Sequence, residues 1–143
     1  MRQKVETMKK KPLSLQDAYW IVARRKIGKY PKSTAQSGKW LIFIDASKVD
    51  SMWREVKQAV EDGLLGDRAK GSTAKPNPNA RDPNRRVICV FTYNYEDIED
   101  ARRIRAQLRR LGVTERIAYK ADEDTRKGKY RNKGHRQISK FFE

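Results

Sequence analysis

Two apolar runs, each followed by an amphipathic helical pattern, set the strongest limit on the fold of this chain. The runs are Lys39–Asp45 and Arg86–Tyr93, and both are rich in β-branched and aromatic residues, a composition typical of strands. Apolar residues then recur every three or four positions from Val49 to Val60, and again from Ile98 to Leu111, the spacing of a buried helix face. A strand followed by a helix is therefore predicted twice.

The ends of both helices are also marked. Gly63 and Gly112 each follow the last apolar position of a helical stripe, where glycine commonly ends a helix. We expect Ser47 or Asp50 to cap the first helix. Acidic residues crowd the start of the second helix and arginines its later turns, which suits the helix dipole.

The remaining elements are less strongly marked. Short strands are predicted at Ala69–Thr73 and Arg116–Lys120, with loops at 28–38 and 76–85. Residues 14–22 have helical spacing after Ser14, although a strand through 19–23 stays open. We expect Ile138, Phe141 and Phe142 to form a last strand or turn. Strands that alternate with two amphipathic helices give a two-layer α+β sandwich, with the helices on one face of a sheet.

The length sets the domain organisation. A chain of 143 residues has room for one domain. We expect a basic N-terminal arm over 1–12 and a single α+β domain over 13–143, with a basic C-terminal segment at 126–140. No run approaches 18 consecutive apolar residues, so we expect no membrane partner. The basic start is followed by no apolar signal core, which favours a cytoplasmic location.

The charge is strongly unbalanced. The chain has 34 Lys and Arg against 18 Asp and Glu, a formal net charge of +16. Such a balance indicates a polyanionic partner, most commonly nucleic acid. The alternative is the solvated surface of a heat-adapted protein, but such a surface needs both signs in near balance. We therefore expect RNA as the partner.

The basic residues fall in three stretches. Residues 1–32 contain ten Lys and Arg and two acids, residues 68–86 contain six and one, and residues 126–140 contain seven and none. Because these stretches lie in expected loops and ends, we predict that they contact phosphate. Tyr130, or an exposed Trp20 or Trp40, would stack on a base, whereas Trp53 belongs to the core. The predicted contact residues are Lys9, Lys10, Lys11, Lys70, Lys75, Arg81, Arg85, Arg86, Arg126, Lys127, Lys129, Tyr130, Arg131, Lys133 and Arg136.

Candidates for catalysis are few. His135 is the only side chain whose ordinary pKa lies near neutrality, and Lys120 and Lys133 are the lysines that we consider beside it. Cys89 lies inside an apolar run and is expected to be a core residue. The acidic residues 122–124 are expected to form a turn, although metal binding stays open. We expect no cofactor.

A set of motifs resembles a known family. Its first part is Gly38-Lys39-Trp40-Leu41, Val49-Asp50-x-x-Trp53, Gly63-x-x-Gly66 and Ala69-Lys70-x-Ser72-Thr73. Its second part is Ile88–Tyr93, Arg105-x-x-Leu108-x-x-Leu111-Gly112 and Tyr119-Lys120-x-Asp122-x-x-Thr125. Over roughly 38–130 the chain resembles the phosphothreonine-lyase-like family that includes the Bles (basophilic leukaemia expressed) proteins. The resemblance implies a fold like that of the cap-binding translation initiation factor, with a curved, mainly antiparallel sheet backed by two or three helices.

Two functions follow as hypotheses. The first is a non-enzymatic module that binds structured RNA, for example ribosomal RNA, through phosphate contacts, alone or with protein partners in a ribonucleoprotein. The second is a phosphate-handling enzyme that acts on a phosphothreonine or a nucleotide, in which Arg81 or Arg86 would hold the phosphate. The bacterial lyases of the resembled class have a Lys-x-His stretch, and here only Lys133-Gly134-His135 has that spacing. The residues therefore favour binding over catalysis.

Overall fold

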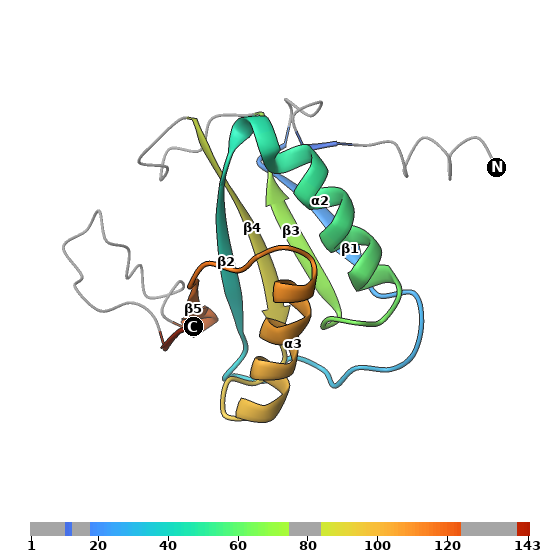
Figure 1. Ribbon diagram of the computed structural model, residues 1–143. Helices are drawn as coiled ribbons and strands as arrows, with labels where there is room; N and C mark the ends of the chain where they lie inside the picture. Colours follow the sequence, from blue (N-terminus) through green and yellow to red (C-terminus); the bar gives the residue numbers. More distant parts are fainter. Residues whose placement is uncertain (1–10, 13–17, 75–83, 124–139) are drawn as a thin grey trace.

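The computed structural model describes residues 11–12, 18–74, 84–123 and 140–143, and these form one sheet with two helices (Figure 1). The elements in chain order are β1 (Trp20–Arg24), β2 (Gly38–Asp45), α2 (Ala46–Glu61), β3 (Arg68–Ser72), β4 (Arg85–Thr92), α3 (Ile98–Arg110), β5 (Ala118–Ala121) and β6 (Phe141–Phe142). The six strands have the spatial order β1-β3-β4-β2-β5-β6, and every neighbouring pair is antiparallel. The predicted α+β class is confirmed.

Both helices pack on the same face of the sheet; in Figure 1, α2 lies at the upper right beside β1 and β3, and α3 lies lower, in front of β4. Trp53 on α2 and Trp40 on β2 are fully buried between the layers, and the indole Nε1 of Trp40 donates to the carbonyl of Ala101 on α3 at 3.0 Å. Neither helix has the length and apolar composition needed to cross a bilayer. The layering follows from the two apolar stripes that the sequence contains.

Among the described residues, no helix lies over the other face of the sheet. Along β2 the core residues Trp40 and Ile42 alternate with Lys39, Leu41 and Phe43, which point to this open face because successive strand residues point to opposite sides. The side chain of Phe43 is 52% exposed. An apolar run of this kind suits burial on both faces of a strand, but on β2 the open face is only partly buried.

The N-terminal helix prediction is wrong where the structure describes it. Residues 20–24 form the edge strand β1, in which Ile21 and Ala23 are buried and Val22 and Arg24 are exposed. This burial period of two is that of the strand alternative at 19–23. The strand forms because its backbone pairs with the edge of β3. Residues 13–17 and Ile138 lie outside the described residues.

The helix ends largely follow the predictions. Gly63 has a φ of +77°, and Gly112 a φ of +106°, so both glycines occupy the left-handed region that other residues rarely adopt. The N-cap of α2 is Asp45, without a side-chain capping bond, rather than Ser47 or Asp50. At α3 the side chain of Asp97 accepts from the amide of Asp100.

Gly38 on β2 and Tyr119 on β5 pack closely against each other. Gly38 lies against the ring of Tyr119, and a Cβ atom built on Gly38 would stand 2.5 Å from that ring. The Tyr119 hydroxyl shares a hydrogen bond of 2.7 Å with Thr92, and its ring packs edge-on against Trp40. A glycine at position 38 therefore lets β5 lie close to β2.

Candidate anion-binding site on the open face of the sheet

A row of cations crosses the open face of the sheet. Arg24 on β1 pairs with Arg68 on β3, and Lys39 on β2 pairs with both Phe91 on β4 and Lys120 on β5. The register of β3 with β4 puts Arg68 opposite Phe91, and its guanidinium lies 4.2 Å from the centre of the Phe91 ring. Four cations from four strands therefore share one row, with an aromatic ring at its centre.

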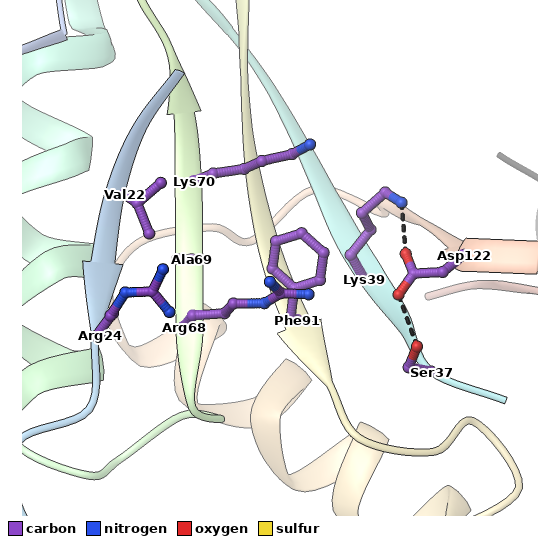
Figure 2. A pocket seen from close by; sticks show the side chains of 9 residues that line it. All are labelled: Val22, Arg24, Ser37, Lys39, Arg68, Ala69, Lys70, Phe91 and Asp122. Atoms are coloured by element: carbon purple, nitrogen blue, oxygen red, sulfur yellow. Dashed lines mark hydrogen bonds and ion pairs between the residues drawn. The ribbon is translucent and has the colours of Figure 1, made fainter. Parts of the chain in front are cut away.

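All of this row except Lys120 lines a pocket of about 400 Å³. Figure 2 shows its side chains, with Arg24 and Arg68 on one side of Phe91 and Lys39 on the other. Lys70 enters from the neighbouring row, two residues after Arg68 on β3. The lining residues, which define the open-face pocket, are Val22, Arg24, Ser37, Lys39, Arg68, Ala69, Lys70, Phe91 and Asp122.

The charge of the open-face pocket is only partly neutralised. Asp122 accepts from the ammonium of Lys39 at 2.7 Å and from the hydroxyl of Ser37 at 2.8 Å. Within the described part of the chain, no carboxylate forms an ion pair with Arg24, Arg68 or Lys70. Four cations and one carboxylate leave a local net charge of +3.

Aromatic rings orient two of these cations. The Lys70 ammonium lies 4.0 Å from the centre of the Trp20 ring, and the Arg68 guanidinium lies 4.2 Å from the centre of the Phe91 ring. Such cation–π contacts stabilise a charge without neutralising it. Burial lowers the pKa of Lys70, and the nearby cations of Lys39 and Arg68 lower it further.

One donor in the pocket is buried without a partner. The Nε of Arg68 has no hydrogen-bond partner among the described residues. A buried unpaired donor is unfavourable, and the planar guanidinium that carries it matches oxyanions bidentately. The pocket is therefore organised to accept a negatively charged oxygen ligand.

Cys89 faces the same side of the sheet beneath Lys70. It pairs with Lys70 across β3 and β4, and burial raises the pKa of its thiol to about 11. The thiol is therefore protonated near neutral pH, as expected for a core cysteine and not for a nucleophile.

Of the predicted contact residues that the structure describes, only Lys70 lines the pocket. Arg85 lies six residues along β4 from Phe91 and pairs with Asp45 at 3.3 Å; Arg86 follows it, and Lys11 is exposed. Lys120, a candidate for proton transfer, is buried beside Lys39. The predicted residues outside the described part of the chain are Lys9, Lys10, Lys75, Arg81, Arg126, Lys127, Lys129, Tyr130, Arg131, Lys133, His135 and Arg136.

The tryptophan and acidic predictions are resolved in part. Trp20 is the tryptophan that reaches the open face, whereas Trp40 and Trp53 belong to the core. Asp122 forms its ion pair in the pocket, and Glu123 accepts from Tyr95 at 2.8 Å. No group of three potential metal ligands occurs among the described residues.

Sequence reasoning missed three of the pocket cations. Lys39 belongs to no basic stretch, and Arg24 and Arg68 lie in the stretches 1–32 and 68–86 but were not among the predicted contact residues. The available signal was alternation: Arg68-Ala69-Lys70 and Gly38-Lys39-Trp40 place a cation between small or core residues. Only the register shows that these cations meet.

The fold belongs to a known structural class. A crystal structure of schistosome eIF4E complexed with m7GpppA and 4E-BP matches with a TM-score of 0.57, 18% identity, and coverage of 76% of this chain and 59% of that chain. A second schistosome structure, with m7GpppG and 4E-BP, matches with a TM-score of 0.56, 19% identity and the same coverages. The chain thus spans less than two thirds of the length of these structures, and the likeness establishes an eIF4E-like fold.

The family follows from the sequence match. Residues 22–126 match the model of the basophilic leukemia-expressed protein Bles03. The chain belongs to the Bles03 family, which confirms the predicted resemblance and extends it to β1. The match contains every residue that lines the open-face pocket.

Proposed function

We propose that this chain binds RNA through its open-face pocket and the surrounding sheet. The observation that carries the proposal is the local net charge of +3, in which three cations have no carboxylate partner among the described residues. RNA phosphates would supply the missing negative charge. The overall net charge of +16 favours the same class of partner.

Exposed aromatic side chains on the open face support RNA in particular. Single-stranded RNA is commonly bound on sheet surfaces, where aromatic rings stack on its unpaired bases. Phe43 is 52% exposed on this face and lies four residues along β2 from Lys39, or about 13 Å at the rise of a strand. A strand whose phosphate occupies the pocket would reach Phe43 with a base one or two nucleotides away.

The test compares two double variants with the same loss of charge. Arg24→Gln with Arg68→Gln removes two pocket cations, and Lys48→Gln with Arg54→Gln removes two exposed cations from α2, which covers the opposite face. Fluorescence anisotropy with a single-stranded RNA should show a loss of about tenfold or more for the pocket variant. A similar affinity for both variants would refute the pocket as the binding site.

The salt dependence gives a second readout. In a plot of log affinity against log salt concentration, each phosphate contacted in a single strand contributes a slope of about −0.7. The pocket variant should have a shallower slope than the α2 variant. RNA that co-purifies with the wild-type protein, recognised by its ultraviolet absorbance and by sequencing, would identify the natural ligand.

A phosphate-handling enzyme is the second candidate. Lys70 favours it, because burial lowers the pKa of its ammonium in a pocket that also holds two arginines. A neutral lysine amine accepts protons, and arginines stabilise a leaving phosphate. Release of phosphate from a phosphothreonine peptide, abolished in Lys70→Arg, would support catalysis; no release by the wild-type protein would refute it.

A further inference from the structure

The cations of the open-face pocket converge on one place instead of forming a track. Arg24 and Arg68 are direct cross-strand neighbours, whose Cβ atoms are about 5 Å apart in such pairs. Lys70 follows two residues later on the same face of β3. An internal phosphodiester has one negative charge and two free oxygens, so it cannot satisfy three such donors equally well.

Arg68 is prepared for an oxyanion with several free oxygens. Its guanidinium is held against Phe91 at 4.2 Å, and its buried Nε has no partner among the described residues. Because Nε is buried, the two terminal nitrogens of the guanidinium are the donors that can reach a ligand, and together they can bind two oxygens of one group. A phosphate monoester has three terminal oxygens and a charge of about −1.5 to −2 near pH 7, so it leaves a third oxygen for Lys70.

Asp122 limits the site on the side of β2. Its carboxylate accepts a hydrogen bond from the Lys39 ammonium at 2.7 Å and another from the Ser37 hydroxyl. A phosphate chain that crossed from β4 over β2 would meet this negative charge. The volume of about 400 Å³ lies in the range of pockets for single small ligands. The pocket therefore ends where a continuous backbone would have to continue.

We propose that the open-face pocket holds a single phosphate monoester, supplied by a terminal phosphate of an RNA strand, in preference to internal phosphodiesters. This inference rests on the proposed RNA binding and names the group that the same pocket selects. The Arg68 fork contacts two oxygens, Lys70 and Arg24 contact the remaining charge, and Asp122 excludes a second phosphate. A free mononucleotide carries the same group and is the other source of this ligand chemistry.

The test uses one RNA sequence with three kinds of ends and an internal fluorophore. The strands carry a 5′-phosphate, a 3′-phosphate, or hydroxyls at both ends, and are titrated with the full chain. We expect one phosphorylated strand to bind at least about tenfold more tightly than the hydroxyl strand. Arg68→Lys, which keeps the charge but loses the fork, should remove this preference, and Arg54→Lys on α2 should keep it.

Competition with free AMP and adenosine separates the two sources. If the phosphorylated RNA binds more tightly than AMP and adenosine does not compete, the RNA end is the ligand. If AMP binds as tightly as the phosphorylated strand, the monoester is confirmed, but the RNA source is overturned. If all three strands bind equally and Arg68→Gln weakens them equally, RNA binding stands and the monoester inference fails.

Failure of the proposed function has a different signature. If this chain binds RNA no better than a neutral control protein does at about 0.1 M salt, both proposals fail. If a phosphothreonine peptide displaces the fluorescent RNA while the ends of the RNA make no difference, the pocket selects a phosphoprotein, and the RNA inference is overturned.

Discussion

Removal of one carboxylate should strengthen anion binding and weaken the fold. Asp122 neutralises Lys39 at 2.7 Å inside the open-face pocket, so Asp122→Asn raises the local net charge from +3 to +4. Lys39 and Ser37 donate to different oxygens of Asp122. The nearly isosteric asparagine keeps an oxygen that accepts from Lys39, and its NH2 group can donate to the Ser37 hydroxyl. The change therefore removes charge while it keeps most of the packing.

The size of the gain follows from distance. The closest approach of a pocket phosphate to the Asp122 carboxylate would be across Lys39, at two hydrogen-bond lengths, or about 5.5 Å. At that distance two unit charges repel by about 0.8 kcal/mol with the dielectric constant of water, and by about 3 kcal/mol with a value of 20. Because the Asp122 side chain is only 14% exposed, we expect a gain between these limits, about tenfold in affinity.

Stability should change in the opposite direction. Loss of the ion pair leaves the largely buried Lys39 ammonium without its carboxylate, which we expect to cost about 1–2 kcal/mol. Glu55→Gln is the matched control, because it also changes the net charge from +16 to +17 but lies exposed on α2. Anisotropy with 5′-phosphorylated RNA and urea unfolding measure the two effects. Equal affinity of the two variants, or weaker binding by Asp122→Asn, would refute the charge argument.

Three further outcomes are expected. The pKa of Lys70 is lowered mainly by burial, so its ammonium loses its proton at a lower pH than other lysines do. Affinity for RNA should therefore fall as the pH rises towards the ordinary lysine range, and Lys70→Arg should remove this fall; a parallel loss in both proteins would contradict the prediction. Gly38→Ala should cost about 2–4 kcal/mol in urea unfolding, since its Cβ would stand 2.5 Å from the Tyr119 ring and disturb the bond to Thr92; an unchanged midpoint would contradict this packing. Phe43→Ala should reduce RNA affinity by about 1–3 kcal/mol and leave binding of AMP unchanged, whereas equal effects on both ligands would argue against stacking.

The fold was predictable because its strongest elements are local patterns. The apolar run of β2, the stripe of α2 and the ending Gly63 lie within 26 consecutive residues, from 38 to 63, and each is independent of distant contacts. β1 is different, since residues 14–22 have both helical and strand-like spacing. Pairing with the edge of β3 decides between them, and a tertiary contact of this kind is invisible in local sequence.

The site was predicted less well for the same reason. The predicted contact residues were chosen from basic stretches in expected loops and ends, and of those that the structure describes Lys70 alone lines the pocket. Arg24, Lys39 and Arg68 are 15 and 29 residues apart in sequence and meet only through the order β1-β3-β4-β2. That order requires connections that cross the sheet, and no single stretch of sequence specifies it.

The most direct measurement follows the side chain of Arg68 in solution. Its Nε–H group should give a distinct signal in a ¹H–¹⁵N spectrum of the labelled protein, because the group is buried and has no partner among the described residues. On addition of 5′- or 3′-phosphorylated RNA, this signal and the backbone amides of β1, β3 and β4 should shift together, while the exposed residues of α2 stay unchanged. Shifts confined to the helical face, or an Arg68 signal that does not move at saturating RNA, would contradict binding at the open-face pocket.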